Sequence, residues 1–271
     1  MLIAIDAGHG IDTAGKRCDK SVDPKETREW TLNSRVANYV QEYLKPYKDC
    51  TTYRVDDVSG KTDIPLATRV KTANTKGADL YLSIHHNAAV KLLTTGGGIE
   101  AYAYTNGSKE SFSWRDDLYK SLIKHTGLVG NRSTPLLTAN FYVIKYTKMP
   151  AVLLELGFMN SKADTPIIIT DEYAQSCAKA IVETIVNKGK LKKDDEHYSV
   201  QIGDYKVKAN AVNMKNSLKN AKFNAIIKTE QGADGCTHYK VQVGYYKVKA
   251  NAVALQKALK DMGYKSIIKV Y

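Results

Sequence analysis

Residues 78–88 read ADLYLSIHHNA, an apolar strand pattern that runs directly into two histidines. Its almost continuous apolar character is typical of a strand covered on both faces in a parallel sheet. Residues 2–5 (LIAI) and 152–156 (VLLEL) have the same character. Further strand patterns at residues 51–55 and 98–104 alternate with helical patterns. The first 187 residues therefore predict an α/β domain with a twisted, mostly parallel sheet flanked by helices.

Each of the three apolar runs leads to a side chain that can bind a metal or a proton. The first run is followed by His9 between two glycines, the second by His85 and His86, and the third contains Glu155. If these strands are parallel neighbours, the groups meet at the edge of the sheet where wound α/β folds place their sites. Glu155 needs a cation, a partner or a raised pKa, because an unpaired buried carboxylate is costly.

Glu29 is a fourth candidate, at the head of a helical pattern. Leu32, Val36 and Val40 lie on the same stripe, so Glu29 faces the core side of this helix. Two imidazoles and one carboxylate leave a fourth position for water, as catalytic zinc requires. Taken singly, each group has an ordinary explanation, such as a first-turn acid favoured by the helix dipole. Their conjunction favours a metal hydrolase.

The C-terminal part contains an internal repeat. The sequence of residues 197–230 is similar to that of residues 238–271, at an offset of 41 residues. Each copy has a strand–helix–strand pattern. One copy is too small to bury its own apolar face, so the two copies should pack together. We expect a small α+β, ferredoxin-like domain of two β-α-β repeats, with four strands and two helices on one side. Residues 188–196, which are mostly charged, predict a linker.

The charge of the chain is unevenly distributed. The net charge is +12, and the residues from Asn187 onward contain 17 lysines and 7 acidic residues. Such a basic segment attracts nucleic acid, anionic membrane or anionic cell-wall polymer. The segment lacks the aromatic run by which RNA-recognition domains stack bases, so no nucleic-acid partner is expected. No run approaches the roughly 18 apolar residues of a membrane span.

The cysteines are far apart and form no C-x-x-C pair. Since the sequence opens without an export signal, we expect synthesis in the cytoplasm. We therefore expect free thiols rather than disulfides. The four residues are Cys18, Cys50, Cys177 and Cys236.

The motifs, taken in order, resemble the zinc-dependent amidase-3 family of N-acetylmuramoyl-L-alanine amidases. The likeness rests on residues 3–10 (IAIDAGHG), 29–37 (EWTLNSRVA), 65–70 (PLATRV), 78–88 and 150–158 (PAVLLELGF). It covers residues 1–187, the expected catalytic domain. It implies an α/β amidase that hydrolyses the bond between N-acetylmuramic acid and the L-alanine of the stem peptide.

The resemblance also implies roles for single residues. His9, Glu29 and His85 would hold one Zn²⁺, and Glu155 would be the catalytic general base that later protonates the departing amine. His86 and Glu26 are the alternatives to His85 and Glu29, and the register of the family motif favours His85 and Glu29. Asn87 and Arg132 are candidate substrate-binding residues. The short segment 104–108 between a strand and the next helix predicts an open groove.

Residues 241–246 (VQVGYY) and the Asn-Ala pairs at residues 210–211 and 251–252 stand at the predicted strands and helix starts of the repeat. Through them residues 197–271 resemble a SPOR domain, a module that binds glycan strands stripped of stem peptides. Tyr205 and Tyr246 are its candidate sugar-stacking residues, although tyrosines on strands are as often part of a core. The expected partner is therefore peptidoglycan, through both its stem peptide and its glycan strand. The oligomeric state stays open.

Two biological settings fit this reading. The chain would act on the cell wall after release, either through a holin-made hole as a phage endolysin or after sporulation as a mother-cell autolysin. A metal-free binding protein on an amidase scaffold is a third alternative, against which the retained Glu155 argues.

Overall fold

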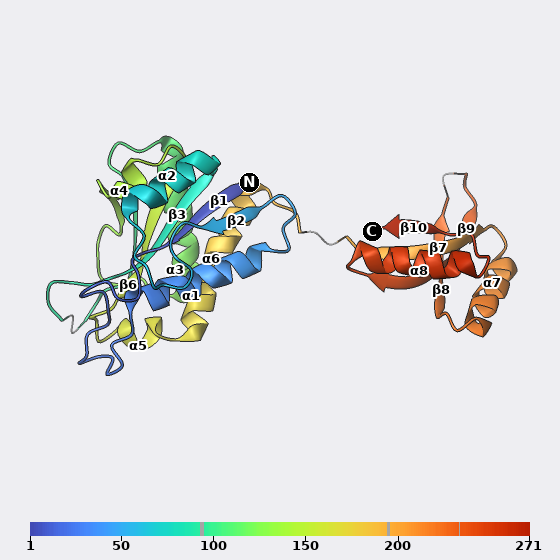
Figure 1. Cartoon of the computed structure of the whole chain (residues 1–271), viewed down its shortest axis with the longest axis horizontal. Coiled ribbons are helices and arrows are strands. Elements are labelled where there is room, and N and C mark those ends of the chain that lie inside the picture. The colour runs from blue at the N-terminus through green and yellow to red at the C-terminus, as the bar shows by residue number, and fades with distance from the viewer. Residues whose placement is uncertain (93–94, 194–195, 233) are drawn as a thin grey trace. The chain divides into compact units, whose positions relative to one another are not determined.

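The structure, a computed structural model, describes residues 1–92, 95–193, 196–232 and 234–271 (Figure 1). It forms two compact units, residues 1–193 and 194–271. The division falls within the predicted linker at residues 188–196, of which residues 194–195 lie outside the described residues. Helix α6 (Asp171–Gly189) continues past residue 187, the predicted end of the first domain.

The first unit is built on a six-stranded sheet of order β2-β1-β3-β6-β4-β5. Only the β4–β6 pair is antiparallel among the pairings of the described strands. The predicted α/β class with a mostly parallel sheet is thus confirmed. The strands are β1 (Leu2–Ala7), β2 (Thr51–Arg54), β3 (Leu80–Asn87), β4 (Ile99–Tyr104), β5 (Leu136–Ala139) and β6 (Ala151–Phe158). The sequence did not predict β5, because this four-residue edge strand is half exposed and has no buried apolar run.

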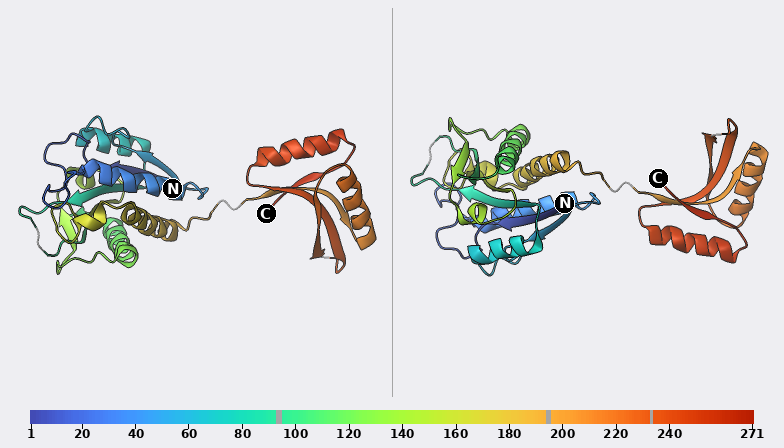
Figure 2. Two further views of the ribbon diagram at one scale, coloured as in Figure 1. Left: turned by 90° about the horizontal axis from the view of Figure 1, so that it is seen from below. Right: turned by 90° about the horizontal axis from the view of Figure 1, so that it is seen from above.

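Helices cover both faces of this sheet, and α2 and α3 can be seen on opposite sides of it in Figure 2. Residues of α1 (Glu29–Leu44), α3 (Lys109–Thr126) and α6 share one core with Leu80, Leu82 and Ile84 of β3. Residues of α2 (Leu66–Lys76) and α4 (Tyr142–Lys145) share the other core with Tyr81. Successive residues of β3 thus point to opposite faces of the sheet, as the two-residue period of a strand requires. The short α5 (Thr165–Ile168) follows β6.

The strand registers bring the chemical groups of the sequence to one edge of the sheet. His85 of β3 lies opposite Glu155 of β6, and Glu155 in turn lies opposite Glu100 of β4. On the other side, β1 pairs with β3 up to Ala7 and Ile84, so His9 follows just beyond the last pair. His9, His85, Glu155 and Glu100 therefore lie close together at one end of the sheet.

The second unit has the predicted four-stranded sheet, antiparallel throughout and ordered β10-β7-β9-β8. Both helices pack on the face that carries Val200 and Val241, through Ala211 and Leu218 of α7 and Ala252 and Leu259 of α8. The helices start 41 residues apart, at Lys208 and Lys249, as the repeat predicts. The elements are β7 (Tyr198–Tyr205), α7 (Lys208–Asn220), β8 (Ala225–Gln231), β9 (Thr237–Tyr246), α8 (Lys249–Asp261) and β10 (Ile267–Val270).

Two further expectations concern the whole chain. All four cysteines are free thiols in the structure. Within the described ranges, no helix has both the length and the apolar character needed to cross a membrane.

Candidate metal centre

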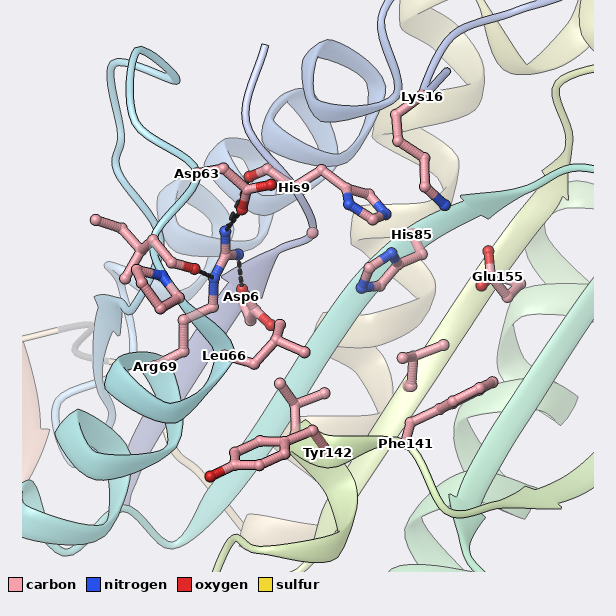
Figure 3. Close-up of a pocket in the computed structure, with 15 residues that line it drawn as sticks. Asp6, His9, Lys16, Asp63, Leu66, Arg69, His85, Phe141, Tyr142 and Glu155 are labelled. Atoms are coloured by element: carbon pink, nitrogen blue, oxygen red, sulfur yellow. Dashed lines mark hydrogen bonds and ion pairs between the residues drawn. The ribbon is translucent and has the colours of Figure 1, made fainter. Parts of the chain in front are cut away.

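The structure brings His9, Glu29 and His85 into one cluster, in which one potential ligand atom of each residue lies within 4.8 Å of the others. Glu29 Oε1 is 3.1 Å from His85 Nδ1 and 3.4 Å from His9 Nε2. Figure 3 shows the two imidazoles side by side, with Glu155 and Lys16 beside them. Residues from a loop, a helix and a strand thus converge on one point.

The backbone around His9 is shaped for this convergence. His9 itself has a φ of 67°, in the left-handed region that non-glycine residues rarely adopt. A Cβ at Gly8 would lie 2.0 Å from the His85 ring, so only glycine lets the two strand ends approach this closely. Asn33 on α1 donates from Nδ2 to the Gly8 carbonyl over 3.1 Å and ties this turn to the helix that carries Glu29.

A buried ion pair lies next to the cluster and contacts the residues around it. Arg69 of α2 pairs with Asp6 of β1, and both side chains are 1% exposed. Arg69 also donates from Nη2 to the carbonyl of His9 over 3.0 Å. On its other side, Asp6 accepts from Ser83 Oγ, which lies 3.2 Å from His85 Nε2. The pair therefore supports both histidines, and neither partner was a candidate from the sequence.

The donor set fits a divalent metal such as zinc. Burial alone would raise the pKa of Glu29, but its contacts with His85 and His9 hold that pKa well below its usual range, so the carboxylate is charged. Its second oxygen, Oε2, is buried without a hydrogen-bond partner among the described residues. The Lys16 ammonium lies 3.7 Å from this oxygen, while the other oxygen, Oε1, faces the two imidazole nitrogens. A carboxylate and two imidazoles are a usual ligand set for catalytic zinc.

Glu155 lies beside this cluster and is not one of its three members. Burial raises its pKa to about 8, with contributions from the negative charges of Glu29 and Glu100 and opposition from His85 and Lys16. Its Oε2 has no hydrogen-bond partner among the described side chains and backbone. A raised pKa and an unengaged oxygen are what a general base for chemistry near neutral pH requires.

The cluster lies at one end of a pocket of about 580 Å³. The polar end includes Glu155 and Lys16, and the exposed side chains of Leu66, Phe141 and Tyr142 form an apolar wall (Figure 3). Strand β4 ends at Tyr104 and α3 begins at Lys109, so the connection is as short as the sequence predicts. The exposure of the apolar wall indicates a groove that is accessible to a chain-like substrate.

Asn87 and Arg132 meet at a residue that the sequence reasoning missed, Glu100. Asn87 donates to Glu100 Oε2 over 3.0 Å, and Arg132 forms an ion pair with the other oxygen. Tyr102 donates to Glu100 over 2.6 Å. Glu100 is buried within an apolar strand, which is the same signal that singled out Glu155, so the sequence did contain the clue. Substrate binding by Asn87 and Arg132 stays a prediction.

The alternatives His86 and Glu26 lie outside the cluster. His86 is buried against α1, with Nδ1 2.8 Å from Asn33 Oδ1. Glu26 forms an ion pair with Arg17 over 3.2 Å. Neighbouring residues on a strand face opposite sides of the sheet, which separates His85 from His86.

The buried His86 predicts an acid-sensitive stability. Burial lowers its pKa to about 3, against the opposing carboxylate of Glu29. Below about pH 6.5 the unfolded chain therefore binds a proton that the folded chain does not, so stability falls as pH falls, by up to about 1.4 kcal/mol per pH unit. Urea unfolding of the chelator-treated protein at pH 4.5 and 7 should show a smaller stability loss for His86→Gln than for the wild type. Equal losses in both proteins would contradict this assignment.

Tyr205 and Tyr246 lie at the edge of the second unit's core. Both rings are half-buried and pack against the core between helices and sheet. A Cβ at Gly203 or Gly244 would lie 2.3 Å from the tyrosine ring two residues further on, so each glycine leaves room for a ring. This packing accounts for both tyrosines without a ligand, and sugar stacking stays a prediction.

Comparisons with known proteins agree with this geometry. A family model described as N-acetylmuramoyl-L-alanine amidase matches residues 3–187, and a SPOR domain model matches residues 190–270. The N-acetylmuramoyl-L-alanine amidase CwlM of Bacillus licheniformis is 30% identical over 228 residues, 84% of each chain. The sporulation-specific N-acetylmuramoyl-L-alanine amidase of Bacillus subtilis (strain 168) is 29% identical over 229 residues, again 84% of each chain.

Two further matches come from a phage and from a solved structure. The endolysin of Bacillus phage SPP1 is 27% identical over 200 residues, 71% of this chain and 67% of the endolysin. The catalytic domain of CwlV, an N-acetylmuramoyl-L-alanine amidase from Bacillus (Paenibacillus) polymyxa var. colistinus, superposes with a TM-score of 0.62 at 27% identity. This superposition covers 70% of this chain and 99% of that domain.

Proposed function

The chain belongs to the N-acetylmuramoyl-L-alanine amidase family and carries a SPOR domain, and from this premise we propose that it is a zinc-dependent lytic enzyme. As a peptidoglycan amidase, it hydrolyses the amide that joins N-acetylmuramic acid to L-alanine. The convergence of His9, Glu29 and His85 beside Glu155 in one accessible pocket is the observation that carries the zinc proposal.

The three clustered residues are the proposed zinc ligands, one ion per catalytic domain. A zinc ion held there would supply Lewis-acid activation of water and of the amide carbonyl. Residues next to the cluster orient its ligands. Arg69 donates a hydrogen bond to the His9 carbonyl. Ser83 contacts Nε2 of His85, the ring nitrogen that does not face Glu29. Such outer contacts fix the ring orientation of metal-binding histidines.

Glu155 is the proposed proton carrier. Its side chain lines the pocket, where the carboxylate can accept a proton from the attacking water. The same carboxyl group then gives the proton to the departing alanine nitrogen, which would otherwise leave as an unstable anion. Buried surroundings favour this transfer, because they keep the pKa of Glu155 close to neutral pH.

The biological setting has two candidates. We propose release onto the cell wall as a lytic enzyme, and the similarity to a phage endolysin supports an endolysin role. A specific observation favours the second candidate, a sporulation amidase: the match to the sporulation-specific enzyme covers 84% of this chain and so extends beyond residues 1–193. Measuring whether the gene is transcribed during prophage induction or during sporulation would separate the two settings.

The experiment that tests the activity is digestion of purified peptidoglycan with end-group analysis. We expect new amino-terminal L-alanine and no new reducing sugar ends. Treatment with a chelator should abolish cleavage, and Zn²⁺ should restore it whereas Mg²⁺ should not, because imidazole ligands select zinc over magnesium. New reducing ends would instead indicate a glycosidase, and full activity after chelation would exclude the metal mechanism.

A further inference from the structure

The strand ends and helices of the second unit carry many lysines and few acids. Residues 205–229 contain six lysines and no acidic residue, and residues 245–271 contain six lysines and one acidic residue, Asp261. The same charge pattern therefore occurs in both copies of the repeat. Four lysines of each copy lie at equivalent positions, 206 and 247, 208 and 249, 219 and 260, and 228 and 269, and the other two lysines of each copy lie at different positions.

Three acidic residues of this unit form ion pairs near the strands. Asp204 lies 2.8 Å from His238 Nδ1, Asp234 lies 2.6 Å from Lys206 Nζ, and Glu230 pairs with Lys240. These groups lie on β7, β8 and β9, just after β7, or in the connection between β8 and β9. The lysines of α7 and α8 form no ion pair within the part of the chain that the structure describes. The two helices thus keep a net positive charge, with Asp261 as the single acidic residue in α7 and α8, while the three paired acids neutralise lysines and a histidine near the strands.

Lysines without an ion pair among the described residues line two grooves at equivalent places in the two repeats, and of these lysines Lys219 and Lys260 are equivalent residues. One groove, of about 620 Å³, is lined by Lys257, Lys260 and Lys265. The other, of about 280 Å³, is lined by Lys215, Lys219 and Lys222. Both grooves lie where a helix ends and the chain turns into the next strand. We call them the basic helical grooves.

The chemistry of the grooves suits phosphate groups and does not suit bases. Lysine ammonium groups bind phosphate oxygens as point charges, and several such contacts are needed because each exposed ion pair is weak. The aromatic side chains at the two grooves are Phe223 and Tyr264, and both are half-buried in the core of the unit. The Tyr264 hydroxyl is also 3.0 Å from Ser217 Oγ. Since neither ring is presented as a stacking platform, the grooves recognise charge and not nucleobases.

We propose that the basic helical grooves bind an anionic phosphodiester polymer of the cell wall. This inference rests on the proposed function, because such a polymer lies beside the peptidoglycan that the first unit cleaves. Binding it would keep the enzyme on the wall and raise the effective concentration of catalytic domain at its substrate. The grooves lie on the helical side of the unit, so the open face of the sheet remains available to a glycan strand.

The test compares two preparations of wall sacculi, one that carries teichoic-acid-type polymer and one stripped of it with hydrofluoric acid. Cosedimentation of the full chain at 0.15 M salt measures binding. We expect the wild type to bind the polymer-bearing sacculi more tightly and increasingly so at lower salt. The variant Lys215→Gln/Lys219→Gln/Lys257→Gln/Lys260→Gln should bind them at least about tenfold more weakly, since it loses four phosphate contacts.

Matched controls make the outcome specific. The variant Lys45→Gln/Lys71→Gln/Lys109→Gln/Lys120→Gln removes the same charge from exposed positions of the first unit and should bind like the wild type. Thermal melting checks that both variants are folded. Unchanged binding by the groove variant would overturn the proposal, as would stronger competition by single-stranded RNA or anionic vesicles than by soluble polymer. Amide cleavage of stripped sacculi, followed in parallel, should be equal in all three proteins; its absence in the wild type would instead refute the proposed function.

Discussion

Replacing Glu155 with glutamine is expected to lower the rate of amide cleavage by about 10²–10⁴-fold, the usual contribution of a general acid–base group. Glutamine preserves the shape of the side chain but cannot accept and return a proton. Glu155 is not one of the three clustered residues that could hold the metal, so the zinc content should not change. Cleavage of purified peptidoglycan and metal analysis of the same preparation measure the two effects.

Two comparison variants make this result interpretable. Glu172→Gln makes the same change at an exposed position in the first turn of α6 and should be fully active. Glu29→Gln should lose both metal and activity, because it replaces a charged member of the cluster. Near-normal cleavage by the Glu155→Gln variant, or loss of its zinc, would refute the separate assignment of Glu155 as the base.

Replacing Arg69 with methionine is expected to destabilise the first unit by about 3–5 kcal/mol, the cost of removing one partner from a buried ion pair. The substitution leaves Asp6 buried and charged, although Tyr81 and Ser83 still donate to it. It also removes the donor to the His9 carbonyl, so metal affinity should fall as well. Urea unfolding in the presence of a chelator measures the loss of stability without the contribution of metal binding.

Tryptophan fluorescence can follow this unfolding in the full chain. The chain has two tryptophans, Trp30 and Trp114, and both belong to the core of the first unit. The control Arg17→Met breaks an exposed pair with Glu26 and should cost less than about 1 kcal/mol. A cost for Arg69→Met as small as that of the control would mean that Asp6 is solvated or protonated when unpaired, and the supporting role of the pair would be wrong.

Much of the fold follows from local patterns in the sequence. Apolar runs at residues 2–5, 80–84 and 152–156 predicted the three central strands, because a strand buried on both faces cannot carry many polar side chains. The repeat in the C-terminal part, which runs without a gap at an offset of 41 residues, predicted its four strands and two helices. A likeness spread over many motifs also predicted the amidase family. All of these features depend on the spacing of apolar residues and on the residue types along the chain, and both can be read directly from the sequence.

Tertiary structure alone decided how the polar side chains combine. Strand register places Glu100 opposite Glu155. The buried Glu100 carboxylate is then within reach of Asn87, which donates a hydrogen bond to it, and of Arg132, which forms an ion pair with it. The ion pair between Arg69 and Asp6 joins two residues that are 63 positions apart in the sequence. Such contacts depend on which strands become neighbours and on which face each residue lies. That geometry is set by the packing of the whole sheet and its helices, and no local pattern in the sequence records it.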